Sequence, residues 1–133
     1  MKKIILITSF LFVLLSVQAQ KRGSFIDKRD NQSYKWVKIG DQTWMAENLN
    51  YDAGQGSICY KEKEKNCEKY GHFYTKKALG NICPDGWHLP KDKEWKTLEK
   101  HLGMSNKVID DSKWRGKKQG KILKSDKGWN KGG

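Results

Sequence analysis

Proline and cysteine are scarce in this sequence, and acidic residues are outnumbered. The 133 residues include two prolines, three cysteines and 15 aspartates and glutamates, against 27 lysines and arginines. The cysteines lack the close Cys-x₂-Cys pairs of structural zinc sites, so we expect no metal site. The formal net charge of +12 favours anionic partners such as acidic polysaccharides, lipid headgroups or nucleic acids. The sequence has no internal repeat and no low-complexity tract, which excludes a solenoid or fibrous architecture.

Long hydrophobic runs are scarce too, and the longest lies at the N-terminus. Two lysines precede an apolar run over residues 4–17, and Ala19 ends a small-residue cleavage pattern. The run has about 14 residues, fewer than the roughly 20 that a membrane-spanning helix requires. We therefore predict that residues 1–19 are a signal peptide. The mature protein is then secreted to the extracellular space, the cell surface or the periplasm, and we expect no transmembrane anchor.

Three cysteines in an exported chain form an odd set, and oxidising compartments favour pairing. Cys59 and Cys67 enclose a short polar loop, and closing it stabilises the fold by about 2.5 kcal/mol in the chain-entropy treatment. We predict this disulfide, which leaves Cys83 as an unpaired thiol. Spacing alone leaves three alternatives open: a bond between Cys59 and Cys83, a bond between Cys67 and Cys83, or three free thiols.

Turn chemistry and hydrophobic periodicity give a coarse map of the chain. Residues 20–33 are polar and show no sustained period, so we predict an exposed leader, with the domain beginning at residue 34. Two segments of strand character flank Gly40-Asp41, a sequence suited to a two-residue β-hairpin turn. Residues 50–68 are charged and turn-rich, which predicts a loop.

The segment CPDGWHLPKDKEW, residues 83–95, places two tryptophans around a proline-led turn. Its second proline restricts the preceding residue to an extended conformation, and a helix is predicted to follow. Trp95, Leu98 and Leu102 recur at i, i+3 and i+7, which is typical of the buried face of a helix. Large indole side chains therefore supply much of the core that we expect in so polar a chain. The predicted core comprises Trp44, Trp87, Leu89, Trp95, Leu98 and Leu102.

Three blocks, VKIGDQTWMAENLNY, NCEKYGHFYT and CPDGWHLPKDKEW, occur in an order and at a spacing that resemble the Fibrobacter succinogenes major paralogous domain, a family of exported bacterial modules. The resemblance covers residues 34–133. The third block is also similar to the core motif of formylglycine-generating, sulfatase-modifying proteins, which share a C-type-lectin-like fold. The resemblance implies an α+β, C-type-lectin-like fold with short helices and a twisted antiparallel sheet.

The family's pattern continues past the final GWNKGG through aromatic and glycine-rich strands to a late cysteine. The resemblance therefore implies that residues 34–133 are the N-terminal part of an incomplete domain, truncated at the C-terminus. It also implies that the late cysteine is the missing partner of Cys83. Lys131 occupies the position of an acidic ligand in calcium-dependent lectins of this fold, which argues against a calcium site. The copper-binding cysteine pair of the sulfatase-modifying proteins has no counterpart, so that activity is not expected.

Candidate catalytic groups are few. His72, His88, His101 and the Cys83 thiol occur in no recognisable pattern of nucleophile and base. His88 is expected to face solvent from an extended segment, and His101 lies late in the predicted helix, where a cation suits the helix dipole. We therefore expect no catalytic residue, no cofactor and no enzymatic activity.

The lysine-rich C-terminal region contains aromatic residues suited to ligand contact. Trp114, Arg115 and Trp129 lie among lysines, an arrangement that can stack on sugars or bases. In the alternative interpretation, Trp114 belongs to the core and the lysines form a solvated face. Export disfavours specific nucleic-acid binding. We expect a non-catalytic binding or adhesion module for a polysaccharide or another anionic surface, and the alternative is a truncated, non-functional or purely structural fragment. The sequence indicates no oligomeric state.

Overall fold

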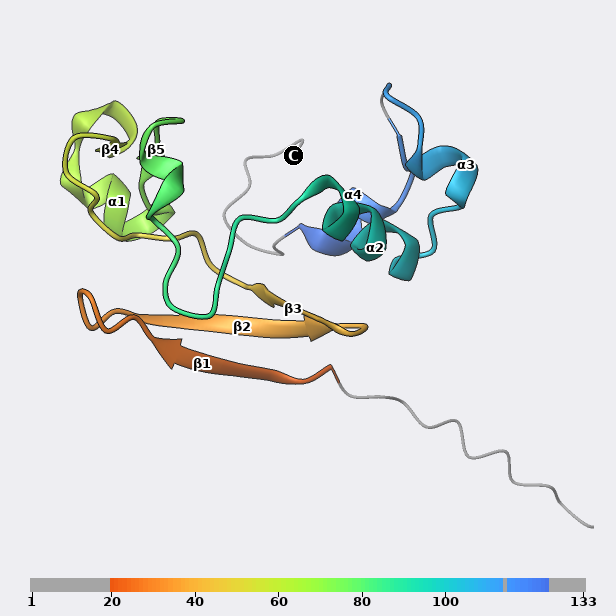
Figure 1. The fold of residues 1–133 in the computed structure, drawn as a ribbon, viewed down its shortest axis with the longest axis horizontal. Helices are drawn as coiled ribbons and strands as arrows, with labels where there is room; N and C mark the ends of the chain where they lie inside the picture. The colour runs from red at the N-terminus through yellow and green to blue at the C-terminus, as the bar shows by residue number, and fades with distance from the viewer. Residues whose placement is uncertain (1–19, 114, 125–133) are drawn as a thin grey trace, which may run out of the picture.

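The larger sheet of the protein is antiparallel and is built from segments that are close in sequence. A computed structural model describes residues 20–113 and 115–124 of the chain. The strands follow the order β1-β2-β3 across the sheet, with bounds of Arg22–Ile26 for β1, Ser33–Ile39 for β2 and Gln42–Met45 for β3 (Figure 1). With short helices and a second, two-stranded sheet, these strands make a small α+β fold.

The turn between β2 and β3 is the one that the sequence predicts. Ile39 pairs with Gln42, which leaves Gly40 and Asp41 as the two-residue connection. Gly40 has a φ of 58°, and a Cβ atom added to it would lie 2.8 Å from His101 Nδ1. Glycine is therefore favoured at this position both by the left-handed backbone and by the close approach of a side chain.

Residues 20–33 do not form the exposed leader that their polarity predicts. Strand β1 lies within this segment and pairs along its whole length with β2. Phe25 lies opposite Tyr34, and its ring stacks on those of Tyr34 and Trp87 at centroid distances of 5.6 and 4.7 Å. The prediction was wrong because β1 is an edge strand, in which only alternate side chains are half-buried. Its backbone hydrogen bonds to β2 do not depend on side-chain type, so a polar composition does not rule them out.

A buried ion pair fastens the connection between β1 and β2 to a distant segment. Asp27 is 2% exposed, and both of its carboxylate oxygens accept hydrogen bonds from Arg29, the shortest at 2.6 Å from Nη2 to Oδ2. Arg29 Nη2 also donates to the Ile82 carbonyl at 2.8 Å, and its guanidinium lies 3.8 Å from the ring centroid of Tyr51. The hydrogen-bonded Arg29 side chain holds the pKa of Asp27 below its usual value, so the carboxylate remains charged inside the fold.

Residues 57–74 form a second region, the disulfide-closed unit, where the sequence predicts only a loop over residues 50–68. The Cys59–Cys67 disulfide is formed, as predicted. The helix within this unit escapes prediction because Cys67 is its one buried residue, so it carries no amphipathic stripe. The elements of the unit are β4 (Ser57–Ile58), the 3₁₀ helix η1 (Tyr60–Glu62), α1 (Glu64–Tyr70) and β5 (Phe73–Tyr74), and β4 pairs with β5 (Figure 1).

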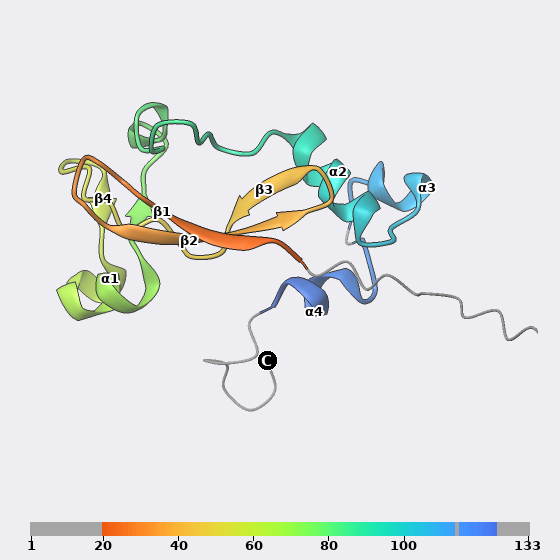
Figure 2. The ribbon, with the colours of Figure 1, turned by 90° about the horizontal axis from the view of Figure 1, so that it is seen from below.

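The predicted helix after the proline-led turn is α2 (Asp92–His101). Its first turn is capped by Glu94, whose Oε2 accepts a hydrogen bond from the Lys91 N–H at 2.8 Å. Asp92 and Lys96 form an i, i+4 ion pair at 3.2 Å. The remaining helices are the 3₁₀ helix η2 (Ala78–Gly80), α3 (Asn106–Ile109) and α4 (Gln119–Leu123). Figure 2 shows α2 and α4 on opposite sides of the three-stranded sheet.

The apolar core is small and draws on segments throughout the described chain. Its buried hydrophobic residues are Tyr34, Cys67, Ile82, Leu98, Met104 and Ile109. Leu98 confirms its prediction, and Trp44, Trp87 and Leu102 are half-buried. Within the described ranges, no helix is both long and apolar enough to cross a membrane.

Two residues predicted for the core are exposed instead. Trp95 is 44% exposed and Leu89 is 43% exposed. Trp95 packs part of its indole on Trp44, with ring centroids 4.8 Å apart, and the rest of the ring faces solvent. Leu89 lies in the extended segment before α2 and receives no comparable cover. The predictions were wrong because helical periodicity locates a face of α2 and does not reveal how far the sheet extends beneath it.

Candidate functional site

Strand pairing in the disulfide-closed unit separates its side chains onto two faces. Ile58 lies directly opposite Phe73, and Ser57 lies opposite Tyr74. Directly paired residues share a face, and neighbours along a strand point to opposite faces. Ile58 and Phe73 therefore share an outer face, with Phe73 57% exposed, while Ser57 and Tyr74 share an inner one.

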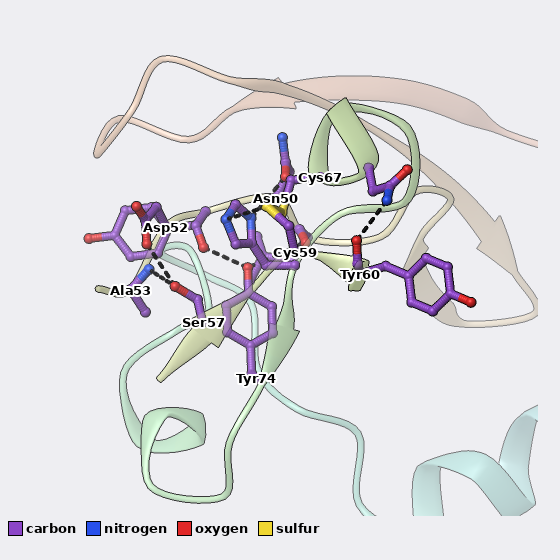
Figure 3. Close-up of a disulfide and its surroundings, with 12 residues drawn as sticks. Asn50, Asp52, Ala53, Ser57, Cys59, Tyr60, Cys67 and Tyr74 are labelled. Carbon is purple, nitrogen blue, oxygen red and sulfur yellow. Dashed lines mark hydrogen bonds between the residues drawn. A yellow bond between two sulfur atoms is a disulfide. The ribbon is translucent and has the colours of Figure 1, made fainter. Parts of the chain in front are cut away.

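Two tyrosines extend the outer face into an aromatic surface. The Tyr60 ring lies 6.3 Å from the Phe73 ring and 6.5 Å from the Tyr70 ring, in edge-to-face arrangements. All of these side chains are exposed, as is that of Ile58. We call Ile58, Tyr60, Tyr70 and Phe73 the aromatic platform. Figure 3 shows the Tyr60 ring directed away from the disulfide, so this ring does not pack against the sulfurs.

Two lysines place positive charge at the aromatic platform. Lys61 Nζ lies 5.3 Å from the Tyr60 ring centroid, and Lys69 Nζ lies 4.9 Å from the Tyr70 ring centroid. Cation–π contacts at exposed sites are worth about 0.5–1 kcal/mol, which biases both ammonium groups to stay beside the rings. Neither lysine takes part in an ion pair within the described residues. Both charges are therefore available to an anionic ligand.

The Cys59–Cys67 disulfide fixes the backbone that carries the platform. Cys59 directly precedes Tyr60, and the next two residues, Lys61 and Glu62, have left-handed φ values of 55° and 54°. Each left-handed non-glycine residue costs about 1 kcal/mol. Covalent closure stabilises the loop by about 2.5 kcal/mol, which offsets that strain and holds the Tyr60 ring in place.

The inner face of the unit is polar and is anchored to the segment before it. Tyr74 Oη donates to the Tyr51 carbonyl at 2.7 Å, and burial raises the pKa of Tyr74. The Ser57 hydroxyl donates to Asp52 Oδ1 at 2.7 Å, which lowers the pKa of the Asp52 carboxyl. These contacts fix the inner face against residues 51 and 52, so the side chains of the outer face point to solvent and not into the core.

A hollow of about 600 Å³ adjoins the disulfide. Carboxylates distinguish this hollow from the lysine-rich remainder of the protein, and they come from Asp30, Asp52, Glu62, Glu64 and Glu68. The sulfurs of Cys59 and Cys67 and a ring nitrogen of His72 also meet here, within 4.8 Å of one another. With the disulfide formed, the two sulfurs cannot act as thiolate ligands.

Most of the chain matches a known family. The family model described as the Fibrobacter succinogenes major domain matches residues 37–132. The protein belongs to this family. The match spans the disulfide-closed unit and α2, and it confirms the resemblance carried by the three sequence blocks. No curated protein and no solved structure matches the chain. The family's description names a domain and no activity, so it assigns no function to the aromatic platform.

In this Fibrobacter succinogenes major domain, Arg115 is the one residue predicted for ligand contact that lies within the described ranges, and it is engaged in other contacts. Arg115 Nε lies 3.1 Å from Glu99 Oε2, and Arg115 Nη1 donates to the Asp111 carbonyl at 3.2 Å. The Arg115 guanidinium therefore joins α2 to the segment that follows α3 and is not free for a ligand. Trp114 and Trp129 lie outside the described residues.

The bond between Cys59 and Cys67 follows the prediction. This bond excludes both alternative pairings with Cys83. Cys83 is a free, half-buried thiol, and burial raises its pKa. A raised pKa keeps this thiol protonated at neutral pH, which makes it a poor nucleophile.

His88 and His101 both have structural contacts. His88 Nε2 lies 2.7 Å from Oε1 of Glu94, the residue that caps α2. The ring of His101 lies against the turn at Gly40. These contacts give both histidines a structural role that requires no reaction at either ring. The lack of enzymatic activity stays a prediction.

A second, larger hollow of about 1590 Å³ runs along the three-stranded sheet beside α4. Trp36, Trp44 and Trp95 line it. Trp95 packs on Trp44, and the Trp36 ring lies over Gly23, where an added Cβ atom would come within 2.5 Å of the indole. Trp36 and Trp44 are half-buried, whereas Trp95 is 44% exposed, much like the rings of the aromatic platform. The platform is the stronger candidate for ligand contact because it joins four exposed apolar side chains to two lysines that lie over its rings.

Sequence reasoning missed the aromatic platform. Its four residues come from β4, η1, α1 and β5, and their spacing follows neither a helical nor a strand period. One signal was available in the segments SICY and YGHFY, which place tyrosine and phenylalanine around the predicted disulfide loop. The pairing of β4 with β5 and the closure of that loop together bring these side chains onto one surface.

Proposed function

We propose that this protein is a secreted, non-catalytic module that binds acidic polysaccharide through the aromatic platform. The observation that carries the proposal is the meeting, on one face of the disulfide-closed unit, of exposed rings and two lysines that form no ion pair within the described residues. Clustered exposed apolar side chains mark interaction surfaces, whereas single ones are common on any protein. Tyrosine and phenylalanine also lose little conformational entropy on binding, because each has only two side-chain torsions.

A chain of acidic sugars supplies both kinds of contact that this surface accepts. The apolar face of a sugar ring packs on an aromatic ring, and the carboxylate of a uronic acid pairs with an ammonium group of Lys61 or Lys69. The formal net charge of +12 falls to +10 when Lys2 and Lys3 leave with the predicted signal peptide. This charge attracts a polyanion over a longer range, and the attraction weakens as ionic strength rises. Ring contacts respond far less to salt, so the two contributions can be separated by experiment.

The proposed function also requires that the protein be exported. The predicted signal peptide over residues 1–19 directs the chain out of the cytoplasm, and a disulfide such as Cys59–Cys67 persists in oxidising compartments. We infer that the mature protein acts at the cell surface, in the extracellular space or in the periplasm, where polysaccharides are accessible. The C-type-lectin-like fold that the sequence resemblance implies agrees with carbohydrate binding.

Isothermal titration calorimetry of the secreted protein with oligogalacturonate tests this proposal, with maltohexaose as the neutral comparison. We expect binding to the acidic oligosaccharide only. The double variant Tyr60→Ala with Phe73→Ala should raise the Kd about tenfold, the equivalent of about 1.4 kcal/mol. Phe73→Tyr alone should leave the Kd unchanged because the ring is retained.

Two lysine variants of equal net charge distinguish a site from general attraction. Lys61→Ala with Lys69→Ala removes the cations of the platform, and Lys76→Ala with Lys77→Ala removes two exposed lysines after β5. We expect the first pair to weaken binding several-fold more than the second. Equal losses in both pairs, or full affinity after removal of the rings, would show that the polymer is held by net charge and not by the platform.

A further inference from the structure

The inner face of the disulfide-closed unit brings together three groups that bind soft metal ions. Cys59 and Cys67 supply two sulfurs, and His72 supplies a ring nitrogen. Cys59 follows β4 and His72 precedes β5, while Cys67 comes from α1. Figure 3 shows Asn50 beside the two cysteines.

His72 is held with one nitrogen directed at the sulfurs. Its Nδ1 lies 2.9 Å from Asn50 Oδ1. An amide oxygen only accepts hydrogen bonds, so Nδ1 carries the proton, and Nε2 of the neutral ring is the remaining acceptor. Nε2 lies 4.0 Å from Cys59 Sγ. A disulfide sulfur has no proton to donate, so within the described residues this acceptor has no donor. An imidazole oriented by a hydrogen bond at its other nitrogen is the arrangement found in metal-ligating histidines.

The distances suit a tetrahedral metal ion after reduction. Zinc bonds of about 2.3 Å to sulfur and about 2.0–2.1 Å to nitrogen separate two thiolates by about 3.8 Å and a thiolate from an imidazole nitrogen by about 3.5 Å. The separation of 4.0 Å between Cys59 Sγ and His72 Nε2 is already close to that value. Once the disulfide is broken, its sulfurs need to part by less than about 2 Å, a distance within reach of side-chain rotation.

We propose that reduction of the Cys59–Cys67 disulfide creates a Zn²⁺ site formed by the two thiolates and His72 Nε2, with water from the adjoining hollow in the fourth position. A soluble dithiol is the reductant. The protein S–S bond breaks, each protein sulfur gains a hydrogen, and the dithiol is oxidised to its own disulfide. Zn²⁺ then displaces the two thiol protons to solvent, two Zn–S bonds form, and Nε2 donates its lone pair.

The metal replaces the disulfide as the link between η1 and α1. The charges of two thiolates and Zn²⁺ cancel, and a ligand set of two sulfurs and one imidazole favours zinc over the hard cations magnesium and calcium. The outer face of the unit then keeps its shape in a reducing environment. This inference concerns the inner face and does not depend on what the aromatic platform binds.

Metal titration of the full protein, in oxidised form and after anaerobic reduction with dithiothreitol and its removal, tests the proposal. One equivalent of Co²⁺ should give thiolate charge-transfer and tetrahedral d–d absorption in the reduced protein, and Zn²⁺ should displace it. The oxidised protein should give neither band. Cys83→Ser should keep both the stoichiometry and the spectrum, because Cys83 is not a ligand in this site.

Variants of His72 and of Asn50, which orients the His72 ring, distinguish a preformed three-ligand site from metal binding by the two thiols alone. His72→Ala should abolish the one-to-one tetrahedral spectrum, and Asn50→Ala should lower the affinity 10- to 100-fold by releasing the imidazole. His88→Ala is the matched control and should change nothing. The proposal is wrong if the reduced protein takes up no stoichiometric metal, if Cys83→Ser removes the spectrum, or if both ring variants match the wild type. Should His72→Ala fail to fold by circular dichroism, Asn50→Ala still decides the outcome.

Discussion

The three-stranded sheet and the disulfide-closed unit use aromatic residues in opposite ways. At the sheet, the Phe25 ring stacks on Tyr34 and on Trp87 with centroid distances of 5.6 and 4.7 Å. In the unit, Phe73 meets Tyr60 edge-on at 6.3 Å and remains 57% exposed. Burial of aromatic surface holds the first region together. A covalent bond holds the second, which leaves its rings available for contact with a ligand.

The sheet depends on the Asp27–Arg29 ion pair, and its loss is expected to have the largest effect. Arg29→Ala should lower the free energy of unfolding by about 4 kcal/mol, because it leaves the buried Asp27 carboxylate without its partner. Urea unfolding followed by tryptophan fluorescence measures this change. A loss below about 1 kcal/mol would mean that the pair does not fasten the β1–β2 connection, and the contrast between the regions would weaken.

The same variant has a predicted pH dependence. The pKa of Asp27 is lowered in the folded protein, so the pair contributes fully above the unfolded carboxyl pKa of about 3.9. Its contribution is lost as the pH falls through the lower folded pKa. The difference in stability between the wild type and Arg29→Ala should therefore shrink in acid. A difference that stays constant from about pH 7 down to about pH 2 would contradict this assignment.

Two leucines on either side of the start of α2 sharpen the distinction between buried and exposed positions. Leu98→Ala should cost about 3 kcal/mol, since Leu98 is 2% exposed. Leu89→Ala should cost less than about 1 kcal/mol, since much of that side chain already faces solvent. Urea unfolding of the two variants provides the comparison. Similar losses would indicate that Leu89 belongs to the core, as its sequence context predicts.

Removal of the disulfide is expected to have a smaller and more local effect. Cys59→Ser with Cys67→Ser should destabilise by about 2.5 kcal/mol, and the loss should be confined to the disulfide-closed unit. Amide hydrogen exchange resolves this directly. We expect β4 and β5 to lose protection while β1, β2 and β3 keep it. Equal loss in both regions would show that they fold as one cooperative body, with no separate role for the covalent bond.

Features with a local sequence signal could be predicted, and features that depend on tertiary contacts could not. The hairpin turn at Gly40-Asp41, the helix α2 and the disulfide were predicted because each has a local signal: turn residues, a helical period or a short spacing. The strand β1 and the exposure of Trp95 were not, because both depend on what lies alongside in space. The aromatic platform depends most on tertiary structure, since its residues come from four elements that the β4–β5 pairing and the Cys59–Cys67 bond hold together.

Chemical-shift mapping tests most directly the claim that the aromatic platform binds acidic sugar. The ¹⁵N-labelled secreted protein would be titrated with oligogalacturonate at moderate salt. We predict that the largest shifts fall on Ile58, Tyr60, Lys61, Lys69, Tyr70 and Phe73, with little change at Trp36 and Trp95. Shifts centred on the tryptophan-lined hollow, or spread over lysines across the whole surface, would contradict the account.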